Sequence, residues 1–262
     1  MGVLRANGLD VAYAVEGDGP PLVLLHGASS SGSADFGPAL PRLRREFTCY
    51  LPDARGHGGT RWDATGGFRY EWLVDDVVGF ADALGLGTFH LMGFSMGGIT
   101  ALAVAARHPA RLRTLVLLGV TMEREPRASI VRRLLDPARI EADEPRWAAD
   151  LADRHDPVQG PGAWRTLLPA IAADVATQPL PTAHDVHGID APTLVGVGDR
   201  DPFVPVDQAV ALRRLLPNGR LLVVPGSGHE VIRHRPAIVN EAVAGFFRDT
   251  VDLASSDTNG RR

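Results

Sequence analysis

Short apolar runs alternate with longer segments of helical periodicity along most of the chain. The first run, "LVLLHG" at 22–27, is uniformly apolar and ends in glycine, which is typical of a strand covered on both faces. Between the runs, segments such as 71–86 space their apolar residues as an amphipathic helix does. This alternation predicts parallel βαβ units in a doubly wound α/β sheet. The predicted strands are 3–16 (as two short strands), 22–27, 47–53, 88–94, 112–120, 192–198 and 219–226.

Residues 122–190 interrupt this rhythm. They are rich in arginine, acidic residues and alanine, and their apolar spacing predicts short helices inserted between two strands of the sheet. We therefore expect one core domain formed by 1–121 and 191–250, with 122–190 as a helical cap. The polar end of the chain, 251–262, has no apolar anchor and is predicted to be disordered.

Composition and charge exclude several reaction mechanisms and kinds of partner. The formal net charge is -4 and all 27 basic residues are arginine, so lysine-dependent mechanisms such as Schiff-base catalysis are excluded. Nothing indicates a phosphate-binding surface, and we expect no nucleic-acid partner. The sequence contains one cysteine, Cys49, no recognisable signal peptide and no apolar run long enough to span a bilayer. These features favour a cytoplasmic protein without a membrane partner.

A glycine-rich segment at 93–98, "GFSMGG", joins a predicted strand to a predicted helix. A sharp turn of this kind forces its apex residue, Ser95, into a strained backbone conformation, and side chains two positions away on either side would collide with neighbouring elements. Glycines at 93 and 97 remove those collisions. The serine hydroxyl is then exposed beside a helix N-terminus, which stabilises negative charge. The pattern predicts a nucleophile at Ser95.

A serine nucleophile needs a base, and the base needs a carboxylate to orient it. Asp199 and Asp201 follow the predicted strand at 192–198, and His229 follows the last strand. Both groups therefore leave the sheet at the same edge as Ser95. The chain order is nucleophile, acid, histidine, as expected for this kind of strand-to-helix turn.

Five motifs in this order resemble the α/β-hydrolase family over about residues 1–250: "LLHGASSSG", "DARGHGGT", "GFSMGG", "GDRDPFVP" and "GSGH". The resemblance implies a mostly parallel, twisted, eight-stranded sheet with helices on both faces and a helical cap insertion. It implies that Asp201 is the catalytic acid and that Asp199 forms a turn. It also implies that the backbone amides of Ala28 and Met96 form the oxyanion hole. Glu123, after the strand at 112–120, is an alternative acid because some members of the family place it there.

The substrate site has weaker signals. Phe94 lies beside the nucleophile, and Trp147 and Trp164 fall in the cap, where they either line a pocket over Ser95 or form the core of the cap itself. These residues predict a small, partly apolar substrate. No metal or organic cofactor is implied. The oligomeric state stays open, a homo-oligomer included.

The leading functional hypothesis is a serine hydrolase that cleaves a small carboxylic ester, thioester or lactone through an acyl-enzyme. Two alternatives use the same triad: a cofactor-free haloperoxidase or perhydrolase, and a hydrolase of carbon-carbon bonds. A third is a small-ligand binding protein on this scaffold. Epoxide hydrolases and haloalkane dehalogenases of the same fold are poor matches, because they carry aspartate where Ser95 stands.

Overall fold

A computed structural model describes residues 1–259, with side-chain positions through residue 250. Eight strands form one sheet in the spatial order β1-β2-β4-β3-β5-β6-β7-β8. Only β1 and β2 run antiparallel to their neighbours, and the strands from β4 to β8 are parallel. The predicted doubly wound sheet is thus confirmed. The strands are β1 (Gly2–Ala6), β2 (Leu9–Glu16), β3 (Pro21–Leu25), β4 (Thr48–Pro52), β5 (Phe89–Phe94), β6 (Leu112–Leu118), β7 (Thr193–Gly198) and β8 (Gly219–Val224).

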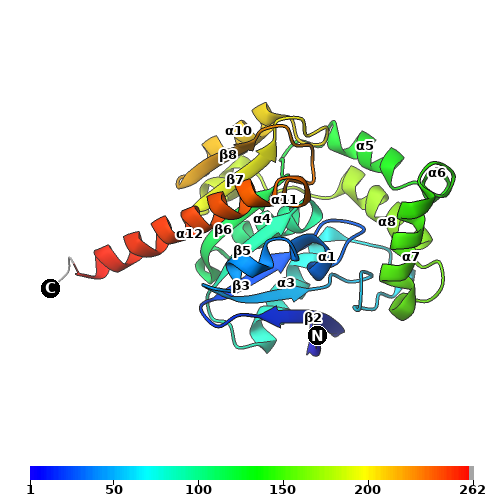
Figure 1. The fold of residues 1–262 in the computed structure, drawn as a ribbon, viewed down its shortest axis with the longest axis horizontal. Helices are drawn as coiled ribbons and strands as arrows, with labels where there is room; N and C mark the ends of the chain where they lie inside the picture. Colours follow the sequence, from blue (N-terminus) through cyan, green and yellow to red (C-terminus); the bar gives the residue numbers. More distant parts are fainter. Residues whose placement is uncertain (260–262) are drawn as a thin grey trace.

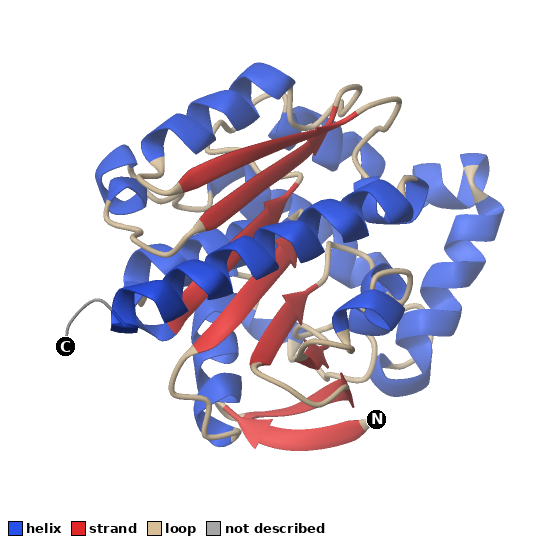
Figure 2. Cartoon of the chain, turned by 60° about the vertical axis from the view of Figure 1, so that its left-hand side comes forward, coloured by secondary structure: helices blue, strands red, loops and turns tan. Residues whose placement is uncertain are grey.

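Helices cover both faces of the sheet, as Figure 2 shows for α12, which crosses one face. The central strands are buried on both sides; β5, for example, has six buried residues in succession. That pattern follows from the uniformly apolar sequence of these strands. One face packs against α3 (Tyr70–Ala83), α4 (Met96–Arg107) and α10 (Val206–Leu215). The other packs against α1 (Gly32–Phe36), α2 (Leu40–Leu43), α11 (Val231–His234) and α12 (Pro236–Asn259).

Between β6 and β7 the chain forms five helices, and the first four of them project beyond the sheet beside the ends of the strands (Figure 1). This is the segment that the sequence predicts as a cap. Its inner side is apolar: Trp164, Leu168 and Ile171 of α8 are fully buried. The helices are α5 (Arg127–Leu134), α6 (Pro137–Asp143), α7 (Pro145–Gln159), α8 (Trp164–Thr177) and α9 (Ala183–His187).

Helix α12 continues to Asn259, nine residues beyond the end predicted for the folded core at residue 250. Val239, Val243 and Phe247 are buried against the sheet and anchor its first turns. Once a helix is anchored, each further residue adds one backbone hydrogen bond, so polar residues can continue it. Residues 260–262, the end of the tail predicted to be disordered, lie outside the described residues.

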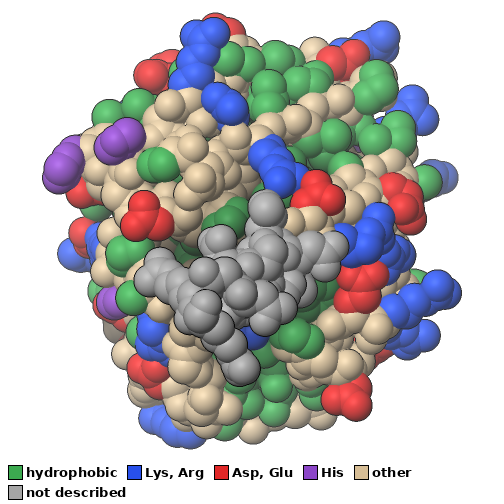
Figure 3. All heavy atoms as spheres, turned by 90° about the vertical axis from the view of Figure 1, so that its left-hand side faces the viewer, with side chains coloured by type: hydrophobic (Ala, Val, Ile, Leu, Met, Phe, Trp, Pro, Cys, Tyr) green, Lys and Arg blue, Asp and Glu red, His purple; other side chains and the backbone are tan. Residues whose placement is uncertain are grey.

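Charges of both signs are interspersed on the molecular face drawn in Figure 3, where arginine and acidic side chains lie beside one another. Salt bridges such as Arg42–Glu46 and Arg220–Asp249 join oppositely charged side chains at the protein surface. Within the part of the chain that the structure describes, no helix combines the length and the apolar composition needed to cross a membrane.

Candidate active site

Ser95 occupies the turn between β5 and α4, at the carboxyl edge of the parallel strands. Its backbone has φ 51° and ψ -113°, a conformation that non-glycine residues rarely adopt. A side chain on Gly93 would meet the backbone of Gly97, and one on Gly97 would meet the carbonyl of Leu25. Two glycines therefore permit the close approach of helix to sheet, and the turn leaves the Ser95 side chain partly exposed.

Three side chains that are far apart in the sequence form a continuous hydrogen-bonded chain. His229 Nε2 lies 2.8 Å from Ser95 Oγ, and His229 Nδ1 lies 2.8 Å from Asp201 Oδ2. The Asp201 side chain is completely buried, whereas that of His229 is 14% exposed. The imidazole therefore links an enclosed carboxylate to a hydroxyl that faces an open cavity.

Asp201 is held in place by its own loop. Its Oδ1 accepts hydrogen bonds from the backbone amides of Phe203 at 2.8 Å and Val204 at 3.1 Å, leaving Oδ2 for the imidazole. Asp199 instead accepts from the amide of Ser227, and hydrogen bonds from the Gly226 and Ser227 amides lower its pKa below the usual range. Asp199 thus orders the loop that carries His229. Glu123, the alternative acid, is exposed, and both ring nitrogens of His229 are paired with Asp201 and Ser95.

Backbone amides frame the space in front of Ser95. Among residues 1–259, the amides of Ala28 and Met96 donate no hydrogen bond to another protein group. The neighbouring Gly97 amide donates to the His26 carbonyl at 3.0 Å, which ties the loop after β3 to the start of α4. The Met96 amide also lies at the N-terminus of a twelve-residue helix, where the helix dipole favours negative charge.

Asp35 supports the loop that carries Ala28, and sequence reasoning missed it. Its buried carboxylate accepts from the Gly27 amide at 2.8 Å and from the Ser30 hydroxyl at 2.6 Å. These two bonds hold the backbone on either side of Ala28. Asp35 lies in the short helix α1 outside the motif residues, so only its proximity to "GASSSG" could have suggested this role.

A cavity of about 560 Å³ opens over Ser95 and His229. Phe94 and Trp147, two of the residues expected at the substrate site, line it together with Phe203, whose ring centroid lies 4.4 Å from that of His229. Sequence reasoning missed Phe203, although it lies within "GDRDPFVP". From the cap, α5 contributes Val131 and Leu134. The cavity can therefore hold a small substrate with an apolar part.

Trp164 does not line this cavity. Its side chain is fully buried within the main hydrophobic core, beside Leu168 and Ile171 of the same helix. Of the two roles open to Trp164 from sequence, a place in the hydrophobic core fits the structure, and this core is continuous from the cap to the sheet. The reason is the apolar face of α8, which buries this residue together with the rest of the helix.

Three histidines join the cap to the loops of the core. The rings of His26 and His57 lie 5.0 Å apart and those of His57 and His155 lie 5.5 Å apart. His155, on α7, accepts a hydrogen bond from the Gly58 amide, and burial lowers its pKa to about 4. Burial also holds the pKa of His57 well below its usual range. The imidazoles of His57 and His155 are therefore neutral at pH 7, and the three rings, packed edge to face, hold the cap against the loops.

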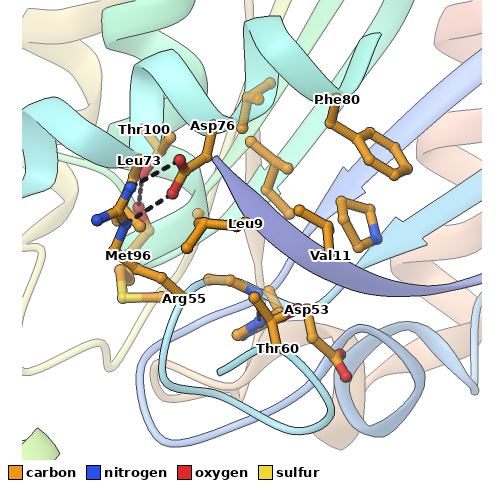
Figure 4. A pocket seen from close by; sticks show the side chains of 16 residues that line it. Leu9, Val11, Asp53, Arg55, Thr60, Leu73, Asp76, Phe80, Met96 and Thr100 are labelled. Atoms are coloured by element: carbon orange, nitrogen blue, oxygen red, sulfur yellow. Dashed lines mark hydrogen bonds and ion pairs between the residues drawn. The ribbon is translucent and has the colours of Figure 1, made fainter. Parts of the chain in front are cut away.

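A second, smaller cavity of about 40 Å³ lies behind the turn (Figure 4). It is lined mainly by apolar side chains, including Leu73 and Phe80, and by Met96 and Thr100 of α4. Arg55 and Asp76 face each other across its rim and form two hydrogen bonds of 2.7 Å. Ser95 does not line this space, so it is separate from the cavity over the triad.

Two further features bear on other chemistry. Cys49 is buried in β4, and desolvation raises its pKa to about 12, which keeps it as an unreactive thiol. Among residues 1–259 the structure contains no group of three or more histidine, cysteine, aspartate or glutamate side chains arranged to bind a metal ion.

Comparison with known proteins agrees with this architecture. The sequence profile of the "Alpha/beta hydrolase family" matches residues 22–242. A 2-(acetamidomethylene)succinate hydrolase of Mesorhizobium japonicum is 28% identical, over 88% of this chain and 89% of its own. A 2-hydroxymuconate semialdehyde hydrolase of Pseudomonas putida is 29% identical, over 82% of each chain.

Among solved structures, a thermophilic esterase from Thermogutta terrifontis superposes with a TM-score of 0.77. It is 24% identical, and the superposition covers 95% of this chain and 98% of the esterase. At this identity the likeness concerns the fold.

Proposed function

We propose a serine hydrolase activity for this chain, which belongs to the alpha/beta hydrolase family. The substrate we propose is a small, partly apolar carboxylic ester, thioester or lactone. The observation that carries the proposal is the continuous Ser95–His229–Asp201 hydrogen-bonded chain, with both bonds at 2.8 Å, which opens into the cavity.

In the first half-reaction His229 Nε2 removes the proton from Ser95 Oγ as the oxygen attacks the substrate carbonyl. The hydroxyl lies 2.8 Å from Nε2, so the proton is transferred without rearrangement. Asp201 Oδ2, on the other ring nitrogen, fixes the tautomer and stabilises the imidazolium that forms. The imidazolium then protonates the leaving group, and the acyl group stays on Ser95.

The amides of Ala28 and Met96 receive the oxyanion of the tetrahedral intermediate. Their N–H groups have no protein acceptor among residues 1–259, so no bond has to break before they bind the developing charge. A donor of this kind contributes about 3 kcal/mol to the transition state. In the second half-reaction His229 activates water, which attacks the acyl-enzyme and releases the acid.

A second candidate is hydrolysis of a carbon-carbon bond in a diketone-like substrate with the same triad. The relative from Pseudomonas putida supports it, because its name denotes a semialdehyde and no ester. In that reaction Ser95 or an activated water attacks the ketone, and the leaving group is a carbanion that must be protonated. The two candidates share the nucleophile and differ in the leaving group.

A fluorophosphonate probe followed by peptide mapping tests the proposed nucleophile, with the Ser95→Ala variant as the control. We expect a single labelled site at Ser95. Turnover by the wild type and by Ser95→Ala is then measured with a panel of esters, thioesters, lactones and one 1,5-diketone. Each substrate is offered with water or with peroxide as the acceptor. Turnover of the esters that persists in Ser95→Ala, or labelling at another residue, would contradict the proposal.

A further inference from the structure

Arg127, the first residue of cap helix α5, is a buried cation without a carboxylate partner. It is 7% exposed, and among residues 1–250 no carboxylate forms a salt bridge with it or contributes to its pKa shift. With the Gln178 amide turned so that its oxygen faces the guanidinium, that oxygen accepts from Nη1 and Nη2 at 2.9 Å each. The Nε–H is buried and unpartnered. A guanidinium has five N–H donors, so the buried group keeps unused donors.

The guanidinium borders the catalytic centre. A small cavity of about 30 Å³ is lined by Arg127, Tyr70, Ser95 and His229, and by the apolar side chains of Ile99, Ile171 and Val175. It shares Ala28, Ser95 and His229 with the larger cavity, so the two spaces meet at the nucleophile. The inner space has room for one small group, such as a carboxylate.

The surroundings of Arg127 favour an anion. Desolvation lowers the pKa of Arg127, the Tyr70 side chain raises it, and the nearby Arg124 guanidinium lowers it. Two guanidinium groups thus lie close together, and no carboxylate of residues 1–250 pairs with Arg127. Tyr70 is fully enclosed, and burial raises its pKa above the usual range, which keeps its hydroxyl protonated as a donor. The nearby carboxylate of Asp174 accepts from the Tyr70 amide at 3.1 Å and does not form a salt bridge with Arg127.

We propose that Arg127 binds a carboxylate of the substrate in the inner cavity, so that the enzyme prefers esters, thioesters or lactones whose acyl or leaving part carries an anionic group. This proposal rests on the proposed function and names its substrate class. The guanidinium and the Tyr70 hydroxyl supply the donors, and the apolar walls exclude water. Charge-assisted hydrogen bonds of this kind are the stronger ones in proteins.

A purely structural role for Arg127 makes a different prediction. If the side chain served only to join α5 to the end of α8 through Gln178, its replacement would affect stability and would act equally on charged and neutral substrates. Discrimination between charged and neutral substrates therefore separates the two roles.

The test compares p-nitrophenyl monoesters of succinate, glutarate and adipate with the mixed methyl p-nitrophenyl diesters of the same acids. In each pair the anionic carboxylate at the far end is replaced by a neutral methyl ester. In the wild-type enzyme we expect kcat/KM to be about 10- to 100-fold higher for the best monoester than for its neutral partner. Arg127→Met should remove this preference, so that the ratio of kcat/KM between the monoester and its neutral partner falls to about one. Arg127→Lys keeps the positive charge and should retain part of the preference for the monoester.

Arg132→Met is the matched control, because Arg132 is an exposed residue of the same helix and the charge change is identical. It should behave as wild type. A second readout needs no catalysis: glutarate should raise the melting temperature of the wild-type protein and of Arg132→Met, but not that of Arg127→Met.

Wild-type enzyme that hydrolyses the charged and neutral esters equally well would overturn this proposal and leave the serine mechanism intact. The same holds if Arg127→Met keeps the preference, or if glutarate stabilises it as it does the wild type. If Arg127→Met does not fold, the ratio of kcat/KM between charged and neutral esters, measured for the wild type and for Arg127→Lys, still tests the proposal. Absence of Ser95-dependent turnover for every ester, by contrast, refutes the proposed function, and glutarate binding then reports on Arg127 alone.

Discussion

Replacing Asp35 by alanine should damage both the stability of the protein and the oxyanion hole. The carboxylate is 3% exposed and accepts two hydrogen bonds, from the Gly27 amide at 2.8 Å and from the Ser30 hydroxyl at 2.6 Å. Ala28 lies between these two residues. Without the carboxylate, the loop loses the contacts that hold it on either side of Ala28.

The expected magnitude follows from the two bonds. A hydrogen bond to a charged group contributes about 1.5–3 kcal/mol, and the buried Gly27 amide is left without an acceptor in Asp35→Ala. We expect the free energy of unfolding to fall by about 3–5 kcal/mol. If the Ala28 amide moves away from the oxyanion, kcat falls by about 10²- to 10³-fold, the cost of one lost donor.

Asp35→Asn is the sharper comparison. The amide oxygen of asparagine can still accept from Gly27, and its NH₂ group can donate to the Ser30 oxygen, since a hydroxyl both donates and accepts. We expect this variant to lose about 1 kcal/mol of stability and less than about tenfold in kcat. Urea unfolding and steady-state hydrolysis of one p-nitrophenyl ester measure both quantities. An Asp35→Ala variant with unchanged kcat, or an Asp35→Asn variant as inactive as Asp35→Ala, would refute this reasoning.

Three further predictions follow from the triad, the buried histidines and the cap. Asp201→Asn should lower kcat by about 10⁴-fold, because the amide favours the wrong tautomer of His229; single-turnover kinetics measure this, and a loss below tenfold would contradict it. Burial lowers the pKa of His155 from 6.5 to about 4. Above pH 6.5 this histidine is neutral in the folded and in the unfolded protein. Between pH 6.5 and 4 the unfolded chain binds a proton that the folded protein does not. The free energy of unfolding should therefore fall between pH 6.5 and 4, by at most ~1.4 kcal/mol per pH unit for this residue, and His155→Gln should show a shallower slope in urea titrations. Trp164→Ala should lose about 3–5 kcal/mol of stability because it leaves a cavity in the core, whereas Trp147→Ala, at the cavity wall, should mainly change KM; the reverse pattern in unfolding and kinetic assays would show that the two roles are exchanged.

Much of the central sheet and the turn at Ser95 could be predicted from sequence, because both depend on local patterns. Uniformly apolar runs such as 89–94 have one suitable environment, between two layers of helices. Glycines at 93 and 97 are required by direct backbone contacts, within the turn for Gly93 and with the end of the neighbouring strand β3 for Gly97. The convergence of Ser95, Asp201 and His229 at one edge follows from the parallel arrangement of strands.

The cap and the polar groups around the site could not be predicted in the same way. Whether Trp164 faces the cavity or the core depends on how α8 packs, and its sequence spacing fits both. Asp35 binds groups within a nearby motif, but it lies outside that motif itself, and Arg127 acquires its partner Gln178 from far along the chain. The continuation of α12 to Asn259 likewise depends on anchoring by Val243 and Phe247 rather than on the polar residues that follow.

The central claim is that Ser95 carries the acyl group during turnover. Rapid quenching of the enzyme with p-nitrophenyl acetate, followed by intact mass and peptide mass spectrometry, tests it directly. The account predicts a transient gain of one acetyl group located on Ser95, formed and lost at rates compatible with kcat. Turnover with the acyl group on another residue, or with no acyl-enzyme under conditions where deacylation is made slow, would contradict it.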